Sequence, residues 1–169
     1  IKTPNYFFLN KKKYMKVNLV KLIKKNKLKY PIVIKPNDEG SSIGVSICKN
    51  LKKLKKEFKK LSYNYNELIF ETYIPGKEIQ AAVLGGKSIG AIELKPKRKF
   101  YDYNAKYKKS ANTLHIMPAD IQKAHYKKVL KISEKAYKIL NCRGVVRCDF
   151  RFYKNQFFLL ELNTQPGMT

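Results

Sequence analysis

The stretch VVRCDFRFYKNQFFLLELNTQPGMT, residues 145–169, decides the fold that we expect for this chain. Two runs rich in apolar residues flank the polar turn at residues 153–156, a pattern typical of two antiparallel strands joined by a short hairpin connection. Because side chains alternate between the two faces of a strand, one face of the hairpin is predicted to be core. The expected core positions are Val146, Cys148, Phe150, Phe152, Phe158, Leu160 and Leu162.

The other face of this hairpin is polar, with Arg147, Asp149, Glu161 and Asn163. Pairing the strands symmetrically about Asn155 places Asp149 opposite Glu161, and a shift of two residues would keep the same faces. It also places Arg147 opposite Asn163. Two carboxylates across a ladder repel each other unless one is protonated or a cation lies between them. Asp, Glu and Asn oxygens suit Mg²⁺, which fills its shell with water and substrate phosphates, so we predict a magnesium–nucleotide site. The alternative is a solvated face in which Arg147 pairs with Asp149.

Length and composition are those of an ordinary globular protein. The chain has 169 residues, 44% of them hydrophobic, enough for one ordinary domain or two small ones. The sequence contains no run of 18 or more apolar residues and no signal peptide, so we expect no membrane partner. Because the chain begins at Ile1 and ends at Thr169, just after a Pro-Gly loop, we expect it to be part of a longer protein.

The net charge of +25 raises the question of nucleic-acid binding. Nearly all the basic residues are lysines, whereas specific base or phosphate recognition favours the arginine fork. Arginine occurs only at Arg98, Arg143, Arg147 and Arg151. The lysines are spread along the whole chain among many Ile, Asn and Tyr residues, a bias typical of an AT-rich genome. We therefore expect no specific nucleic-acid partner, only non-specific attraction at low salt.

The cysteines and histidines indicate neither thiol nor metal chemistry. Cys48, Cys142 and Cys148 form no CxxC pair, so we expect small buried residues in a reducing cytoplasm. His115 and His125 have no ligand spacing to each other or to cysteine, so no metal site is expected there.

Hydrophobic periodicity divides the chain into helices and strands that segregate rather than alternate, so the predicted class is α+β. No regular element is expected in residues 1–10, and residues 95–117 are expected to be a functional loop or disordered. Helices are expected at 18–26, after the N-cap Asn50, and from Pro118 to about Asn141. Strands are expected at 31–36, 45–48, 67–73, 78–84 and 88–94. A boundary near residues 71–76 divides the chain into subdomains at 1–72 and 73–169, and ligands tend to bind between such lobes.

The loop NDEGSSIG, residues 37–44, has the composition of a phosphate-binding loop. Gly40 and Gly44 let backbone amides approach an anion. Ser41 and Ser42 add hydroxyl donors, and Lys35, just before the loop, adds a positive charge. The loop is not a Walker A sequence, which ends in Gly-Lys-Ser/Thr. The alternative is an ordinary turn that connects two strands.

Two further stretches can contribute to a nucleotide site. The strand end Glu71–Ile74 can offer backbone groups to an adenine and Glu78 a carboxylate to a ribose; alternatively, Glu78 is a satisfied surface acid. Residues 100–107, FYDYNAKY, can form a closing loop in which Lys106 meets a phosphate and Tyr107 latches the loop. The alternative for this stretch is an aromatic surface loop or a stacking platform for single-stranded nucleic acid.

Together these stretches resemble the ATP-grasp part of the D-alanine–D-alanine ligase family. The matching pieces are IKPNDEGSSIGVS (34–46), FETYIPGKEI (70–79), FYDYNAKY (100–107), MPAD (117–120), CRGVVRCDF (142–150) and LLELNTQPGMT (159–169). The resemblance implies an ATP-grasp fold, with the nucleotide in the cleft between two small α+β subdomains. It covers only the central and C-terminal lobes of such a ligase.

The resemblance also implies roles for the matching residues. The residues that would contact ATP are Lys35, Glu39, Ser42, Glu71, Ile74, Glu78 and Lys106. Two Mg²⁺ (or Mn²⁺) ions would be bound by Asp149, Glu161 and Asn163. Ser41 and Tyr107 would position the first D-alanine and the closing loop, while Arg147 and the Gly167 amide would stabilise the tetrahedral oxyanion. Thr72 replaces a lysine frequent in the family, so only a backbone contact to adenine is expected there.

The implied activity is the ATP-dependent joining of two D-alanines for peptidoglycan precursor synthesis in the cytoplasm. A D-alanine carboxylate attacks the γ-phosphate to give an acylphosphate, and the amine of a second D-alanine displaces phosphate. Negative charge builds up in both steps, so cations dominate catalysis. A homodimer is implied for the full-length protein, and the fragment alone is expected to be inactive. The alternatives are another ATP-grasp carboxylate–amine ligase, a D-alanine–D-lactate ligase, or a non-catalytic basic fragment that binds nucleic acid.

Overall fold

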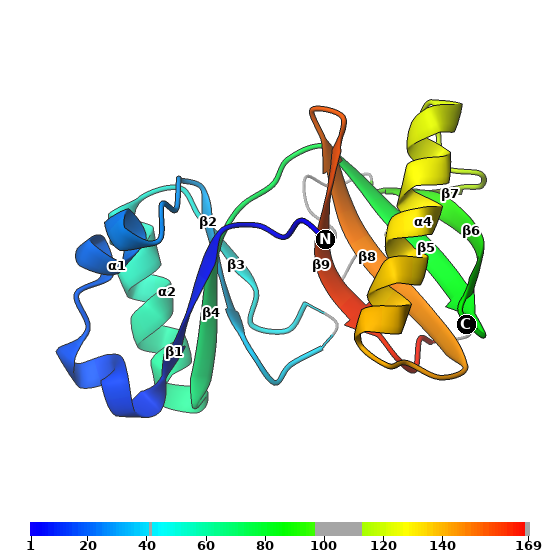
Figure 1. Cartoon of the computed structure of the whole chain (residues 1–169). Helices are drawn as coiled ribbons and strands as arrows, with labels where there is room; N and C mark the ends of the chain where they lie inside the picture. The colour runs from blue at the N-terminus through cyan, green and yellow to red at the C-terminus, as the bar shows by residue number, and fades with distance from the viewer. Residues whose placement is uncertain (41, 97–112, 168–169) are drawn as a thin grey trace. The chain divides into compact units, whose positions relative to one another are not determined.

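The computed structural model describes residues 1–40, 42–96 and 113–167, and these form two compact units (Figure 1). Residues 4–73 make up one unit, and residues 1–3, 74–96 and 113–167 make up the other. Each unit has its own antiparallel sheet and hydrophobic core, which confirms the α+β class. Among the described residues, no helix is both long enough and apolar enough to span a membrane.

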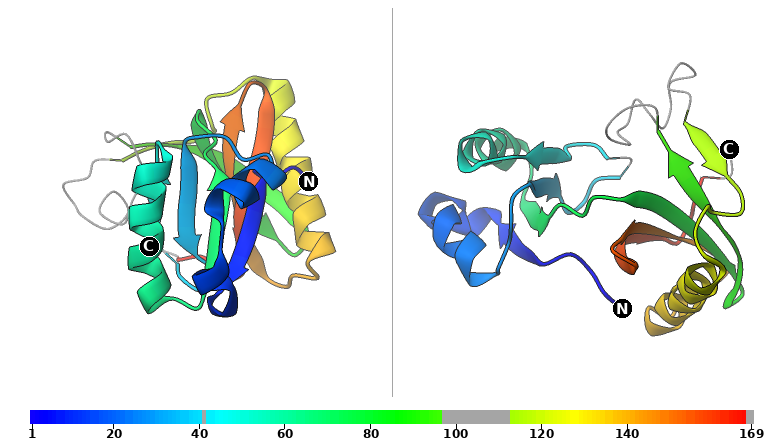
Figure 2. Two further views of the ribbon diagram at one scale, coloured as in Figure 1. Left: turned by 90° about the vertical axis from the view of Figure 1, so that its left-hand side faces the viewer. Right: turned by 90° about the horizontal axis from the view of Figure 1, so that it is seen from above.

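The unit of residues 4–73 is built on a four-stranded antiparallel sheet in the order β1-β4-β2-β3. Its strands are β1 (Tyr6–Asn10), β2 (Ile32–Pro36), β3 (Ser46–Cys48) and β4 (Glu67–Thr72). A 3-10 helix, η1 (Lys11–Lys16), follows β1, and the helices α1 (Leu19–Lys25) and α2 (Leu51–Asn64) cover one face of the sheet (Figure 2). The expectation of no element in residues 1–10 is wrong, because β1 pairs with β4 as an edge strand.

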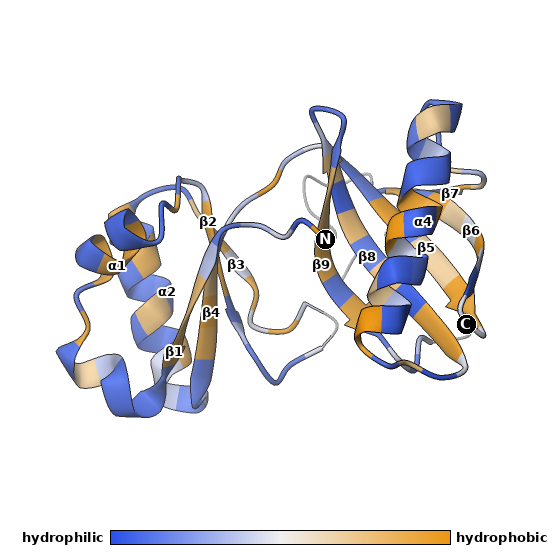
Figure 3. Cartoon of the chain, viewed as in Figure 1, coloured by the Kyte–Doolittle hydropathy of each residue, from blue (hydrophilic) through white to orange (hydrophobic). Residues whose placement is uncertain are grey.

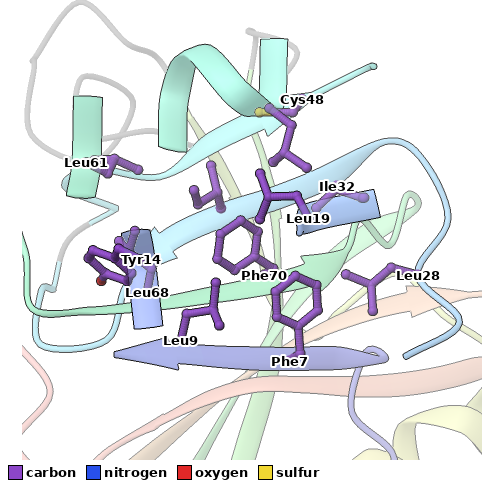
Figure 4. Close-up of a cluster of buried hydrophobic side chains, with 12 residues drawn as sticks. Phe7, Leu9, Tyr14, Leu19, Leu28, Ile32, Cys48, Leu61, Leu68 and Phe70 are labelled. Carbon is purple, nitrogen blue, oxygen red and sulfur yellow. The ribbon is translucent and has the colours of Figure 1, made fainter. Parts of the chain in front are cut away.

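Aromatic and aliphatic side chains fill the space between this sheet and its helices (Figure 4). The rings of Phe7 and Phe70 stack with their centroids 4.6 Å apart. Phe58, from α2, approaches the Phe70 ring at 5.8 Å. On the same helix, Leu54 and Leu61 are buried while the lysines face solvent, as the helical spacing predicts. The opposite face of the sheet carries Lys35 and Glu71 beside apolar side chains such as Phe8, Val33 and Ile69.

The second unit is built on a five-stranded antiparallel sheet in the order β7-β6-β5-β8-β9. Its strands are β5 (Lys77–Leu84), β6 (Lys87–Lys95), β7 (Leu114–Ile116), β8 (Val145–Tyr153) and β9 (Gln156–Asn163). The helix α4 (Lys123–Ile139) packs along one face, against β5, β6 and β8. Apolar and polar residues alternate along β8 (Figure 3), so the face opposite α4 is polar.

The helix predicted to begin at Pro118 begins instead at Lys123. Tertiary contacts hold the residues just before it. The Ala119 N–H donates to a β6 carbonyl (2.9 Å), and the Lys77 ammonium binds the Asp120 carboxylate (3.1 Å). Because these contacts satisfy polar groups outside a helix, the proline does not serve as a first helical turn.

The hairpin β8–β9 forms, but its register near the turn differs from the symmetric one that we expected. The turn consists of Lys154 and Asn155, whose φ angles of 48° and 58° are those of a type I′ turn. A β-bulge between Asp149 and Phe150 restores the expected register farther from the turn.

This bulge changes which residues of β9 are core. Phe157 is buried and Leu159 packs against the same core. Phe158 lies opposite Arg151 on the polar face, and Leu160 is the extra residue of the bulge. The prediction that Phe158 and Leu160 are core residues is therefore wrong, because it assumed an unbroken alternation.

Candidate functional site

The hairpin gathers four predicted site residues on the face opposite α4. Asp149 lies directly opposite Glu161, and Arg147 lies directly opposite Asn163. Cross-strand partners share a face and lie within contact distance, so these side chains form one group. The predicted register at this end of the hairpin is confirmed.

An ion pair dominates the contacts within this group. The Arg147 guanidinium donates from Nε to Asp149 Oδ1 (2.7 Å) and from Nη2 to Asp149 Oδ2 (2.9 Å). Asn163 donates from Nδ2 to Asp149 Oδ2 (3.5 Å) and to Glu161 Oε1 (3.4 Å). This bidentate pair between Arg147 and Asp149 is what the alternative interpretation, a solvated polar face without a metal, predicts. These contacts alone are therefore compatible with both a structural ion pair and a metal site.

The surroundings of Asp149 oppose its ionisation. Only 6% of the residue is exposed, and this burial raises the pKa of its carboxyl to about 6. Arg147 acts in the opposite direction, through its hydrogen bonds and charge, whereas Glu161 raises the pKa further. A cation between Asp149 and Glu161 would offset their repulsion and lower the pKa.

The oxygen donors at this face suit a hard divalent cation. Asp149 and Glu161 supply carboxylates, and Asn163 can supply a carbonyl oxygen if its amide, which now donates to both acids, makes a half-turn. Mg²⁺ needs only a few protein oxygens when water and phosphate complete its shell. Within the described parts of the chain, no three His, Cys, Asp or Glu side chains are grouped to hold a metal. To bind a metal, Asp149 and Glu161 would therefore need the Asn163 amide and the substrate as further ligands.

Two predicted nucleotide-binding groups near the start of β5 are held by one arginine. Arg151 donates from Nε to the Ile74 carbonyl (3.0 Å) and from Nη1 to Glu78 Oε2 (3.1 Å). It lies opposite Glu78 in the β5–β8 ladder, on the same face as Asp149. We did not identify Arg151 as a site residue from the sequence, although its even spacing from Arg147 and Asp149 is a signal for this face.

In the unit of residues 4–73, the sheet face opposite α2 carries Lys35 and Glu71. Their Nζ and Oε1 atoms lie 3.0 Å apart, and Glu71 is opposite Val33 in the β2–β4 ladder. The neighbouring Thr72 accepts a hydrogen bond at Oγ1 from the Lys29 N–H (3.3 Å). Two predicted nucleotide-binding residues are thus in direct contact, while the Thr72 side chain is bound within its own unit.

The Gly/Ser loop between β2 and β3 is anchored at its ends. Asn37 donates from its backbone N–H to the Glu67 carbonyl (3.0 Å) and from Nδ2 to Glu67 Oε2 (2.9 Å). Gly44 has a φ of +71°, and a Cβ there would lie 2.7 Å from the proline ring that ends β2. Within the loop, Glu39 is exposed and Ser42 is half-buried. The anchors fix where the loop leaves and rejoins the sheet.

Four predicted site residues remain. Ser41, Lys106 and Tyr107 lie outside the described residues. Gly167 is exposed in the segment that follows β9. The roles predicted for these four residues stay predictions.

The fold is that of the ATP-grasp class, as comparison with solved structures shows. D-alanine–D-alanine ligase from Bacillus anthracis matches with a TM-score of 0.83 at 33% identity, over 100% of this chain and 53% of that chain. A structure of D-alanine–D-alanine ligase from the same organism complexed with ATP matches with a TM-score of 0.79 at 27% identity, over 100% of this chain and 51% of that one.

The chain belongs to the family described as D-ala D-ala ligase C-terminus, whose model matches residues 1–169. D-alanine–D-alanine ligase from Pelagibacter ubique is 52% identical over 175 residues, which cover 100% of this chain and 54% of that protein. The chain spans about half the length of the curated relatives it matches. The resemblance stated from the sequence motifs is confirmed.

Proposed function

We propose that this chain supplies the nucleotide- and metal-binding half of a ligase that joins two D-alanines at the expense of ATP. Family membership and the solved relative complexed with ATP support this proposal. The observation that carries it is the facing pair Asp149 and Glu161, two carboxylates whose mutual repulsion a divalent cation would relieve.

Nucleotide contacts are proposed for the residues that the family resemblance implies, some of which the structure shows in contact with partners. We assign them to Lys35, Glu39, Ser42, Glu71, Ile74, Glu78 and Lys106. The Lys35–Glu71 pair, at 3.0 Å, fixes the ammonium before a phosphate arrives. Because an ammonium has three donors, Lys35 can bind a phosphate oxygen while keeping its carboxylate partner.

The metal ligands are proposed to be Asp149, Glu161 and Asn163, which would hold two Mg²⁺ or Mn²⁺ ions. Such ions neutralise phosphate charge and stabilise the anionic transition states. On the protein side, Arg147 would share the Asp149 carboxylate and turn part of its fork toward the oxyanion, together with the Gly167 amide. Ser41 and Tyr107 would position the first D-alanine.

The proposed reaction has two steps. A carboxylate oxygen of one D-alanine attacks the γ-phosphorus of ATP, and ADP leaves, so an acylphosphate forms. The amine of the second D-alanine attacks the acyl carbon, phosphate leaves, and the nitrogen loses a proton. Because both steps concentrate negative charge, the residues that matter are the cations and ligands named above, and no side-chain nucleophile is needed.

We propose a cytoplasmic location and a role in peptidoglycan precursor synthesis. The three cysteines are free, as expected in a reducing compartment. Cys48 and Cys148 are fully buried, and burial raises the pKa of both thiols to about 11. Cys142 is only half-buried, so the expectation of burial holds for two of the three. A homodimer is proposed for the complete enzyme on the family resemblance alone.

Calorimetric titration of the chain with ATP tests the metal site. We expect binding in the presence of Mg²⁺ and its loss in EDTA. Glu161→Gln should weaken Mg-ATP binding about tenfold or more, because it removes one charged ligand. The matched control is Glu134→Gln on α4, whose Oε1 accepts the Ser88 N–H (3.0 Å), a bond that glutamine can keep. Metal-independent ATP binding, or equal effects of the two substitutions, would refute the metal site.

A further inference from the structure

Arg151 contacts both the segment ahead of β5 and a carboxylate on the polar face of the sheet. Its Nε binds the Ile74 carbonyl at 3.0 Å, and its Nη1 binds Glu78 Oε2 at 3.1 Å. The side chains of Arg151 and Glu78 are only 13% and 15% exposed. One guanidinium thus fixes a backbone carbonyl ahead of β5 and a carboxylate on β5.

A guanidinium is suited to this task because its donors form a rigid fork. The planar group presents N–H donors in fixed directions, so holding two acceptors at once also fixes their relative position. Low exposure reduces screening by water and keeps the pair from exchanging partners. A carboxylate bound at one oxygen can still accept hydrogen bonds elsewhere, since its two oxygens offer about four lone-pair directions.

We infer that Arg151 is a positioning residue that gives this site its selectivity for the sugar of the nucleotide. The inference rests on the proposed function, in which Glu78 accepts a hydrogen bond from a ribose hydroxyl and Ile74 lies at the base. Arg151 holds the Glu78 carboxylate in one orientation, so that the hydroxyl meets a preorganised acceptor. Without Arg151, the Glu78 side chain must lose its conformational freedom when the nucleotide binds. This entropy cost offsets the free energy gained from the hydrogen bond to the ribose hydroxyl, so the preference for the ribonucleotide is lost.

The alternative role of Arg151 is purely structural, as an ion pair that stabilises the sheet. The two roles differ in what they do to different nucleotides. A structural role affects every nucleotide equally, because the lost stability does not depend on the sugar. A positioning role affects the ribonucleotide and leaves deoxynucleotides, which lack the hydroxyl, nearly unchanged.

Titration of the chain with Mg-ATP, Mg-2′-deoxyATP and Mg-3′-deoxyATP separates these roles. We expect the wild-type chain to prefer ATP over at least one deoxynucleotide by about tenfold, the effect of one hydrogen bond to a charged group. Arg151→Met should reduce this preference to about twofold or less while leaving deoxynucleotide affinity within about threefold. Arg151→Lys, which keeps the charge but not the fork, should recover only part of the preference.

The control variant is Lys77→Met, which removes the ion pairs of Lys77 with Glu93 and Asp120; Lys77 is on the same strand as Glu78 but on the face that α4 covers. Lys77 binds Glu93 at 2.9 Å, next to the position of Glu78. We expect Lys77→Met to lower the thermal unfolding temperature and to leave the ATP preference unchanged. Loss of the preference in this variant would show that any broken ion pair has the same effect, and would overturn the inference.

The result for Glu78→Gln distinguishes failure of the inference from failure of the proposed function. Suppose that Glu78→Gln abolishes the ATP preference, whereas Arg151→Met either retains it or weakens the binding of all three nucleotides equally. The contact between Glu78 and the sugar then stands, and the role of Arg151 is refuted. If the wild-type chain binds no Mg-ATP, or Glu78→Gln keeps the full preference, the proposed nucleotide site itself fails.

Discussion

The buried carboxyl group of Asp149 links the candidate site to the stability of its unit. In the unfolded chain its pKa is near the ordinary value of 3.8, and burial raises it to about 6 in the folded state. Between these values the folded state binds more protons than the unfolded state. The contribution of Asp149 to stability therefore falls as the pH rises from about 4 to 6, and it stays reduced above pH 6.

Asp149→Asn should remove this pH-dependent penalty. Between pH 4 and pH 7.5, the unfolding free energy of the variant relative to that of the wild-type chain should rise by about 1–3 kcal/mol. Urea unfolding at the two pH values measures the shift. Asp120→Asn serves as the control, because the Asp120 side chain is 81% exposed. A difference that does not change with pH would contradict the raised pKa of Asp149.

At the scale of the elements, α1 and α2 are capped by asparagines that immediately precede them in the sequence. The Asn50 side chain accepts a hydrogen bond from the Lys53 N–H (2.9 Å) at the start of α2, as its position before the apolar stripe predicts. Asn18 caps α1 in the same way, through the Lys21 N–H (3.0 Å). Such a cap satisfies a backbone donor that the helix leaves without a partner.

Asn50→Ala should destabilise the unit of residues 4–73 by about 1 kcal/mol, the usual cost of losing an N-cap. The measurement is urea unfolding followed by circular dichroism. Asn50→Asp, which keeps the acceptor, should stay close to the wild-type chain, and Lys52→Ala at an exposed position of the same turn should change little. If Asn50→Asp were as unstable as Asn50→Ala, the capping bond would not be the cause.

For the whole molecule, we predict that the net charge of +25 belongs to solvated surfaces and not to a defined nucleic-acid site. The lysines of α2 lie on its exposed face: Lys52, Lys53, Lys55, Lys56, Lys59 and Lys60. Those of α4 are likewise exposed along the side away from the sheet. Flexible lysines on separate helices can attract a polyanion without fixing its position.

Nucleic-acid binding should therefore be weak and should depend steeply on salt. A defined DNA or RNA oligonucleotide, followed by fluorescence anisotropy, should bind at low ionic strength and dissociate as the salt concentration rises. We expect no submicromolar affinity at physiological salt. Submicromolar binding that persists there would show that the lysines form a real binding surface.

The class, the family and the polar face of the hairpin could all be predicted from the sequence. The alternation along residues 145–169 was sufficient to place Asp149 and Glu161 on one face, because the period of a strand is a local property, whereas the bulge decides that they lie directly opposite each other. The N-caps were predictable for the same reason. The family motifs, such as EGSS and ExNTxPGMT, pointed to the family that the comparisons confirm.

Features that depend on distant neighbours could not be predicted from the sequence and follow from the tertiary structure. The strand β1 exists because β4 pairs with it, and α4 begins late because Lys77 binds Asp120. The register set by the turn places Phe158 on the polar face opposite Arg151, and the bulge after Asp149 brings Glu161 back opposite Asp149. The hydrogen bond of Arg151 to Glu78 and the raised pKa of Asp149 likewise arise from burial and from partners on other strands. Hydrophobic period is local, whereas pairing, burial and charge depend on which segments meet in space.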